Sequence, residues 1–286
     1  PRWVAIACAL LVIGTAESAD NSVKQFSYKS TDIKAGLTLL SGAGGNIAVL
    51  QSDNGVLVVD NGLERNDKAL QAALEQFGGR AMYVLNTHWH GDHTGGNRAL
   101  SEQATILAHE NVRLRLAGQD NDDADKSVAD AFPDITYDDG ITLHFGGQTV
   151  RVVHFPGGHT DGDSVVYFEP AHVVHLGDLM FADYFPYVDV DSGGSVTGYI
   201  NNVAAIEAQL DDEHIVIPGH GQITDKQGVR RFHQMMIETT TAIAEMKSAG
   251  QSLQQIQQQG LGDKWQGWGD FFIDESRWIS IVYNDL

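Results

Sequence analysis

The chain has 286 residues, a mass of 31.1 kDa and 42% hydrophobic residues, so it can bury a sizeable core in one large domain or two fused halves. Its 38 acidic and 18 basic residues give a formal net charge of -20, and no stretch is rich in Lys or Arg. Because polyanions bind to clustered cations, this charge argues against nucleic acid and anionic membrane surfaces as partners. A small-molecule substrate is the expected partner, and nothing in the composition indicates an oligomeric state.

The N-terminal segment has the pattern of an export signal: one basic residue, an apolar run too short to span a bilayer, and then small residues. We predict a signal peptide over residues 1–18, cleaved after Ser18. The mature chain, residues 19–286, is then expected to be a single domain, periplasmic or secreted, and free of the membrane. Cys8 is the sole cysteine, so the mature chain would contain no thiol and no disulfide.

Short β-branched runs punctuated by Gly, Asn and Asp predict a series of strands. In chain order they cover residues 37–40, 47–51, 56–60, 82–86, 105–108, 141–145, 150–155, 164–168, 173–176 and 214–218. The early strands are joined by hairpin-like turns such as Asp53-Asn54-Gly55, whereas the later strands alternate with helices. This order predicts two packed sheets with helices outside them.

Apolar residues at helical spacing predict helices over residues 66–77, 95–101, 199–210 and 227–249. From about 225 to 286 the chain is expected to be largely helical. The aromatic residues of this region are expected to pack it onto the body of the protein rather than to line a substrate cleft. They are Trp265, Trp268, Phe271, Phe272, Trp278 and Tyr283.

Residues 87–93 contain three histidines and one aspartate in the order HxHxDH: His88, His90, Asp92 and His93. In an extended segment His88, His90 and Asp92 point to one side, whereas a turn at the intervening glycine lets Asp92 and His93 face a second ion. Neutral imidazole and carboxylate suit zinc, and iron or manganese could also bind. The coordination is completed only if residues elsewhere in the chain contribute.

Three further metal-capable side chains follow, each where a strand-like run gives way to a Gly-rich turn: His159, Asp178 and His220. Four strand ends would therefore bring seven donors to one rim of a sheet. Taken singly, Gly-His and Gly-Asp mark turns, but in this order they predict a metal centre. The remaining histidines are expected to be ordinary surface or capping residues. They are His109, His144, His154, His172, His175, His214 and His233.

With these motifs the chain resembles the metallo-β-lactamase superfamily, over about residues 37–221. The resemblance implies an α/β fold, the αβ/βα four-layer sandwich of two sheets flanked by helices, with two zinc ions at one edge. It also implies the ligands of each ion: His88, His90 and His159 for the first, Asp92, His93 and His220 for the second, and Asp178 as the bridge between them.

The activity implied by this resemblance is that of a metal-dependent hydrolase, and the predicted signal peptide would make it an exported one. It would cleave a lactam, lactone, ester or thioester with a hydroxide that bridges two zinc ions. Asp92 would orient the hydroxide and carry its proton to the leaving group. Asp178 is similar to the aspartate of glyoxalase II and the lactonases, whereas β-lactamases carry a cysteine or a non-ligand at that position. The sparsely basic C-terminal region disfavours a glutathione thioester.

Three other functions remain open from the sequence. They are a β-lactamase proper, a mononuclear-iron oxidoreductase similar to persulfide dioxygenases, and a periplasmic metal-binding protein without turnover. The complete second set of ligands argues against the last two.

Several residues around the predicted centre have expected supporting roles. Asp60, Thr87 and Thr160 are expected to fix the outer nitrogens of the ligating imidazoles. Residues 41–46 form either a mobile flap over the metals or an ordinary hairpin turn. Residues 180–187, which follow Asp178, are expected to offer aromatic walls to flat apolar substrate groups.

Overall fold

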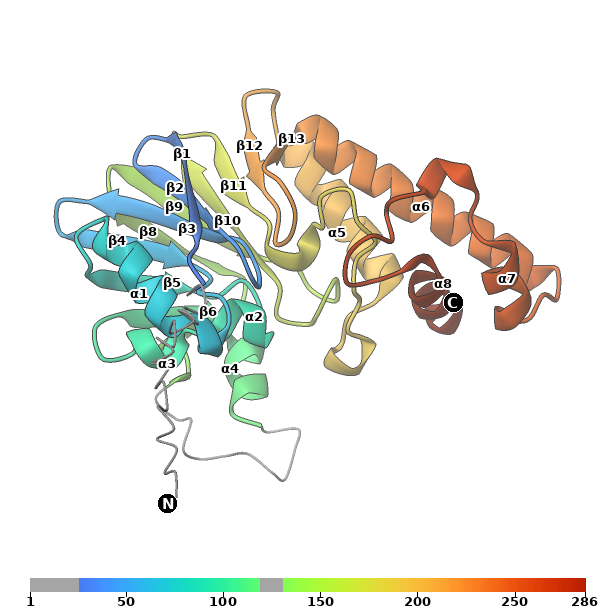
Figure 1. The fold of residues 1–286 in the computed structure, drawn as a ribbon, viewed down its shortest axis with the longest axis horizontal. Helices are drawn as coiled ribbons and strands as arrows, with labels where there is room; N and C mark the ends of the chain where they lie inside the picture. Colours follow the sequence, from blue (N-terminus) through green and yellow to red (C-terminus); the bar gives the residue numbers. More distant parts are fainter. Residues whose placement is uncertain (1–25, 119–130) are drawn as a thin grey trace, which may run out of the picture.

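The computed structural model describes residues 26–118 and 131–286. Two β-sheets pack face to face, with helices on both outer faces (Figure 1). The fold class predicted from the sequence, an αβ/βα four-layer sandwich, is confirmed. The predicted signal peptide, residues 1–18, lies outside the described residues.

The first sheet has seven strands in sequential order. They are β1 (Lys29–Lys34), β2 (Leu37–Ser41), β3 (Ile47–Ser52), β4 (Gly55–Val59), β5 (Ala81–Leu85), β6 (Thr105–His109) and β7 (Ile135–Tyr137). The strands from β1 to β4 are antiparallel neighbours, and those from β4 to β7 are parallel. The predicted turn between β3 and β4 is present, because Ser52 pairs with Gly55 across Asp53 and Asn54.

The second sheet has six strands in the order β13-β12-β11-β10-β9-β8. They are β8 (Gly140–Phe145), β9 (Gln148–His154), β10 (Ser164–Glu169), β11 (Val173–His175), β12 (Ile215–Ile217) and β13 (Thr224–Asp225). Only β11 and β12 pair in parallel within this sheet. Because they are parallel, their carboxyl ends open at the same edge.

The α-helices fall into two sets, and no helix among the described residues is long and apolar enough to cross a membrane. The set near the first sheet comprises α1 (Asp67–Glu75), α2 (Gly91–Thr94), α3 (Asn97–Leu100) and α4 (Glu110–Leu116). The set beyond the second sheet comprises α5 (Val196–Gln209), α6 (Lys226–Ser248), α7 (Leu253–Gln259) and α8 (Glu275–Asp285) (Figure 1). Short 3-10 turns η1 (Glu64–Asn66), η3 (Gly177–Leu179), η4 (Val190–Ser192) and η5 (Asp263–Trp265) connect them.

Three apolar cores correspond to the three interfaces between layers. Between the sheets, Leu50 and Val59 of the first meet Val152 and Phe168 of the second. Outside the first sheet, side chains of α1 and α3 cover β3 to β6. Outside the second sheet, α5, α6 and α8 form the largest core. Both faces of each sheet are therefore buried, which explains the nearly continuous apolar runs of the central strands.

The sequence missed the elements with weak patterns. The edge strands β1, β7 and β13 and the short helices α2 and α4 were not predicted. The expected turn at Gly91 is present, because α2 begins there, so Asp92 does not continue the extended segment that ends at His90. His90 is the last extended residue, with φ −61° and ψ 146°. Asp92 and His93 thus lie on a helical turn, and the ring of His93 lies 4.2 Å from that of His88 between centroids.

The C-terminal helices pack onto the body as expected, and Trp278 of α8 is the largest fully buried side chain. Its indole N–H donates to Thr239 Oγ1 at 3.0 Å, and its ring stacks with Phe185 at 5.9 Å between centroids. We predict that Trp278→Ala lowers the free energy of unfolding by about 3–5 kcal/mol, because it removes a large buried ring and leaves a cavity. Urea unfolding followed by circular dichroism measures this change.

The matched control is Ile237→Ala on α6, where the side chain is 42% exposed. This change is expected to stay within about 0.5 kcal/mol of the parent. Equal unfolding midpoints for the two variants would show that the C-terminal helices do not stabilise the body.

Candidate metal centre

Four chain segments deliver the seven predicted donors to one edge of the sandwich. The HxHxDH motif follows β5, His159 lies in the loop between β9 and β10, Asp178 lies in η3 after β11, and His220 follows β12. Gly219 N–H donates to the carbonyls of Gly177 and Met180 at 2.7 and 3.1 Å, which ties the last two segments together. The parallel register of β11 and β12 thus sets the separation of Asp178 and His220.

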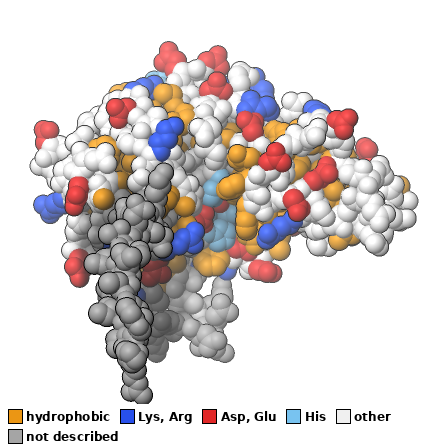
Figure 2. All heavy atoms as spheres, in the orientation of Figure 1, with side chains coloured by type: hydrophobic (Ala, Val, Ile, Leu, Met, Phe, Trp, Pro, Cys, Tyr) orange, Lys and Arg blue, Asp and Glu red, His pale blue; other side chains and the backbone are white. Residues whose placement is uncertain are grey.

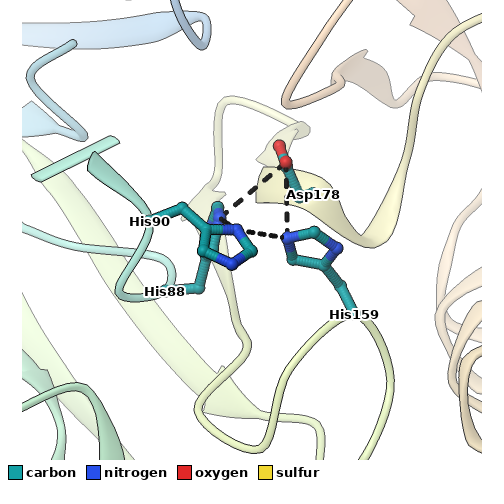
Figure 3. A group of neighbouring side chains, drawn as sticks. All are labelled: His88, His90, His159 and Asp178. Atoms are coloured by element: carbon teal, nitrogen blue, oxygen red, sulfur yellow. Dashed lines mark hydrogen bonds and ion pairs between the residues drawn. The ribbon is translucent and has the colours of Figure 1, made fainter. Parts of the chain in front are cut away.

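The first group of donors consists of three imidazoles and one carboxylate (Figure 3). His90 Nδ1 lies 3.1 Å from His88 Nε2 and 2.8 Å from His159 Nε2. Asp178 Oδ2 lies 3.8 Å from the first of these partners, His88 Nε2, and 3.5 Å from His159 Nε2. Three nitrogen atoms and one oxygen that converge in this way have the composition of a tetrahedral zinc site.

The second group consists of Asp92, His93 and His220. His93 Nε2 lies 3.4 Å from His220 Nε2, and Asp92 Oδ2 lies 3.7 and 3.3 Å from these two nitrogens. Asp178 reaches this group with its other oxygen, since Oδ1 lies 3.0 Å from His93 Nε2 and 3.4 Å from His220 Nε2. The two oxygens of one buried carboxylate therefore face two different groups of donors.

The contacts of these residues fit a pair of cations. Asp178 is 5% exposed, and its Oδ1 is buried without a hydrogen bond of normal geometry despite the nearby imidazoles. A buried oxygen left without a donor costs free energy unless something else satisfies it. A cation between Asp178 and the imidazoles would do so.

Four of the five imidazoles have their outer nitrogen fixed by a polar atom. His88 Nδ1 lies 3.0 Å from Thr87 Oγ1, and His93 Nδ1 lies 2.7 Å from Asp60 Oδ2. The other two contacts are His90 Nε2 with Asp189 Oδ2 at 2.9 Å and His159 Nδ1 with the carbonyl of Tyr187 at 2.8 Å. Such contacts set the tautomer and the ring orientation that a metal ligand needs.

Burial keeps two of the imidazoles neutral. It lowers the pKa of His88 well below its usual value and that of His159 to about 4. Each ring therefore offers a nitrogen lone pair at neutral pH, as a metal ligand must.

In the second group, the nearby carboxylates determine the pKa values of the imidazoles. Burial lowers the pKa of His93 and His220, but Asp178 and Asp92 outweigh it, so the pKa of His93 is raised well above its usual value and that of His220 to about 9. Burial raises the pKa of Asp178, yet His220, His93 and His88 bring it well below the usual range. A cation that binds here displaces protons from the imidazoles, so its binding is coupled to proton release.

Two glycines allow the segments to approach one another closely. A Cβ on Gly219 would lie 2.1 Å from Asp178 Oδ1, and a Cβ on Gly45 would lie 2.2 Å from His93 Cε1. Gly45 N–H also donates to the carbonyl of Asp92 at 3.1 Å. The glycines therefore make room for the donors, which is a reason for their presence beyond turn formation.

The expected supporting residues are found in part. Asp60 accepts from the N–H and Oγ1 of Thr87 at 2.8 Å each, so one carboxylate orders both His88 and His93. Thr160 does not touch a ligating ring and instead donates to Asp163, which corrects the expectation for this residue. Asp163 is fully buried, and burial raises its pKa to about 8.

The contacts of Asp189 and of the Tyr187 carbonyl were not anticipated from the sequence. Asp189 lies 99 positions after His90 in the chain. A backbone carbonyl carries no side-chain signal at all, and no local pattern links an aspartate in an irregular loop to a distant histidine.

The other histidines lie outside the two groups, and His175 differs from expectation. It is fully buried rather than exposed or capping, with Nε2 3.0 Å from the Asn46 carbonyl and Nδ1 accepting from Gly177 N–H at 3.1 Å. It supports the loops behind the centre. His109 caps α4 as expected, since its side chain accepts from the N–H of Asn111.

Two of the remaining histidines, His172 and His214, flank Asp211. They directly precede β11 and β12, so they lie at the amino ends of these strands, whereas the metal centre lies at the carboxyl ends. They form a third group of metal-capable side chains, which is partly exposed. It is separated from the centre by the length of the two strands.

A pocket of about 1110 Å³ opens above the two groups. Its floor contains His90, Asp92, Asp178 and His220, and Figure 2 shows histidine and acidic side chains in a hollow flanked by hydrophobic side chains. Within residues 41–46, Ser41 ends β2 and the others form the hairpin loop to β3, whose glycine-rich tip lines one side of the pocket. Asn46 N–H donates to Gly219 O at 2.7 Å, so the base of this loop is tied to the centre.

Comparisons with known proteins agree with this geometry. The family model described as "Metallo-beta-lactamase superfamily" matches residues 40–220. A hydroxyacylglutathione hydrolase of Crocosphaera subtropica is 32% identical over 113 residues, which are 38% of this chain and 38% of that protein. A protein of the same name from a Synechococcus species is 35% identical over 120 residues, 39% of this chain and 41% of its own. The chain thus spans about two fifths of the length of these curated relatives.

Solved structures share the fold. A metallo-beta-lactamase from Pontibacter korlensis has a TM-score of 0.62 at 18% identity, over 74% of this chain and 99% of its own. The DIM-1 metallo-beta-lactamase has the same TM-score at 19% identity, over 74% of this chain and 97% of its own.

The contact between Asp189 and His90 gives a test of the first group. We predict that Asp189→Ala weakens metal binding there by about 10- to 100-fold, because the ring of His90 loses the partner that orients it. Titration with a competing chelator, followed by elemental analysis, measures the affinity. The exposed neighbour Asp191→Ala is the control and should leave it unchanged. Equal affinities in the two variants would remove Asp189 from the metal centre.

Proposed function

The chain belongs to the metallo-β-lactamase superfamily, and we propose that it is an exported dinuclear zinc hydrolase that cleaves a lactam, lactone, ester or thioester. One observation carries this proposal. Seven donors from four segments converge in two groups, and Asp178 faces both with separate oxygens. A protein that only stored metal would have no need of a wide pocket above such a centre.

We assign the ligands by these two groups. His88, His90 and His159 would hold the first ion, Asp92, His93 and His220 the second, and Asp178 would bridge them. Imidazole and carboxylate together suit zinc, and no thiolate is among the seven. When bound, the two ions would supply a nucleophile from water at neutral pH and polarise the substrate carbonyl.

Asp92 is the proposed catalytic residue. Burial raises its pKa, but His93 and His220 outweigh this and lower it to about 2, so the side chain is a carboxylate at neutral pH. It lines the pocket and is the most exposed of the seven donors, at 31%. A carboxylate there can accept a hydrogen bond from the attacking water, orient it, and pass its proton to the leaving group.

The completeness of the second group favours hydrolysis over oxidation. A mononuclear-iron oxygenase needs one set of ligands and open positions on one metal. Here Asp92, His93 and His220 are arranged as closely as the first group, and Asp60 orients His93 on its outer side. This ordered second group of donors supports the binding of two ions.

The carbonyl substrate is part of the proposal. The relatives named hydroxyacylglutathione hydrolase and the solved metallo-beta-lactamases are, by their names, proteins that hydrolyse a thioester and a lactam. Both bonds are opened by attack of water on a carbonyl carbon. The shared fold and the two groups of metal-capable donors in this chain support the same type of reaction, with a substrate chosen by its own pocket.

Metal dependence and Asp178 test the proposal directly. We expect about two zinc ions per chain, loss of hydrolysis when a chelator removes them, and recovery when zinc is returned. Asp178→Ala should reduce the zinc content to about one and lower kcat/KM at least about 100-fold, since it removes a direct ligand rather than an outer partner. Elemental analysis and a panel of chromogenic lactams, lactones, esters and thioesters measure both effects.

The control for Asp178→Ala is Asp212→Ala, which changes an exposed aspartate near β12. It should keep both metals and full turnover. Full metal occupancy and activity in Asp178→Ala would refute the bridging role. A content of one iron per chain together with oxygen uptake would contradict the hydrolase and favour an oxidoreductase.

Export is proposed from the sequence of residues 1–18. In a bacterial host, the full chain is expected in the periplasmic fraction, shortened after Ser18, because a short apolar run followed by small residues is what signal peptidase cleaves. Cell fractionation and N-terminal sequencing measure this. A full-length chain that stays in the cytoplasm would contradict the proposal without affecting the metal centre.

A further inference from the structure

One side of the pocket is an aromatic wall, which we define as Phe181, Tyr187, Phe271 and Phe272. Phe181 stacks on the ring of His220, with centroids 5.0 Å apart and planes at 21°. Phe271 approaches the same imidazole at 5.4 Å between centroids. The aromatic wall therefore begins in contact with a proposed metal ligand and extends to the pocket rim.

The two outer members of the wall are exposed to an unusual degree for phenylalanine. Phe271 is 48% exposed and Phe272 is 58% exposed. In the same segment, Trp265 and Trp268 are each 9% exposed, and the carbonyl of Trp268 accepts from Phe185 N–H at 2.8 Å. The tryptophans anchor the segment, so the phenylalanines are held at the pocket rather than left on a loose tail. Adjacent exposed apolar rings on a firm support mark a binding surface.

Neighbouring side chains hold the wall in place. Phe271 packs against Tyr184 at 5.0 Å between centroids. The guanidinium carbon of Arg277 lies 4.9 Å from the ring centroid of Phe272 and 5.5 Å from that of Tyr187. This cation lines a neighbouring pocket and contacts the aromatic faces, so it stiffens the wall without being part of the main pocket lining.

The charges around the pocket disfavour an anionic substrate tail. Apart from the proposed ligands, the described lining residues include the acidic Glu64 and Asp270 and one cation, Arg65. The chain as a whole has a formal charge of -20. A substrate with paired carboxylates, such as a glutathione conjugate, would meet no cluster of cations among the described residues that line this pocket.

We propose that Phe271 and Phe272 are specificity-determining residues, and that they select carbonyl substrates with a flat, apolar, uncharged group beside the scissile bond. An aryl or arylmethyl group could lie along the aromatic wall while its carbonyl reaches the metal centre. Water would then add its oxygen to the carbonyl carbon, the bond to the leaving group would break, and the leaving group would take up a proton. This inference rests on the proposed hydrolase function but concerns a segment outside residues 40–220, where the family model matches.

Binding of hydroxamates to the zinc-loaded protein tests the wall without turnover. Hydroxamates bind zinc directly, so phenylacetohydroxamate and acetohydroxamate differ only in the group offered to the aromatic wall. We expect the aryl compound to bind roughly tenfold more tightly or better, as for apolar groups of this size in a pocket. The 4-carboxy derivative of phenylacetohydroxamate should lose most of that advantage, because it adds a negative charge. Isothermal titration calorimetry measures all three affinities.

The variants Phe271→Ala and Phe272→Ala, singly and together, should reduce the aryl preference, which is the ratio of the phenylacetohydroxamate and acetohydroxamate affinities, stepwise toward one. Phe271→Trp should retain the preference, since it keeps a flat apolar ring. Ile237→Ala, which removes an exposed apolar side chain on α6, is the control and should change nothing. Because both phenylalanines are exposed, thermal unfolding of the variants is expected to match that of the parent.

The outcomes separate this inference from the proposed function. An unchanged aryl preference in the double variant, or tighter binding of the carboxylated compound, would overturn the role of the aromatic wall even in an active hydrolase. An aryl preference that disappears in the double variant would support it. The same binding result in a zinc-loaded protein that hydrolyses no carbonyl substrate would contradict the proposed hydrolysis and still support the role of the aromatic wall in binding.

Discussion

Asp178 is a buried carboxylate surrounded by imidazoles, and the rest of the site is arranged around it. A carboxylate removed from water must be compensated by positive charge or by hydrogen-bond donors. Its two oxygens lie within 3.0 to 3.8 Å of nitrogens from His88, His93, His159 and His220, which come from three other chain segments. The fold brings these segments together at one sheet edge, and the pair of cations that we propose would satisfy both the carboxylate and the imidazoles.

Each of the two sheets, with its helices and loops, contributes part of the metal centre. The first sheet and its helices supply the HxHxDH motif and Asp60, whereas the second sheet supplies His159, Asp178 and His220. The centre lies where the sheets meet, and loops from both sides tie it together through Asn46 and Gly219. Movement of one sheet relative to the other would separate the two groups of donors. The apolar core between the sheets is therefore also a support for the chemistry.

The C-terminal region adds a function that the metal centre does not contain. Its tryptophans and helix α8 complete the core outside the second sheet, so most of its aromatic residues pack inward as expected. Phe271 and Phe272 are the exception, because the turn that follows Trp268 places them at the pocket. In this way one segment both stabilises the fold and faces the substrate. Relatives with the same centre and a different C-terminal region are thus expected to differ in substrate rather than in reaction type.

The sequence by itself determined the seven donors, ten of the strands and the layered fold, because each depends on local patterns: β-branched runs, glycines at strand ends and the spacing of HxHxDH. Only the tertiary structure decided which neighbouring atoms orient those donors and which side chains line the pocket. Asp189 reaches His90 across 99 positions, and Phe271 lines the pocket whereas Trp268 does not. Edge strands such as β1 form because a neighbour offers its backbone, and a side-chain pattern does not record that. Long-range contacts depend on the register of packed sheets, which is fixed when the whole chain folds.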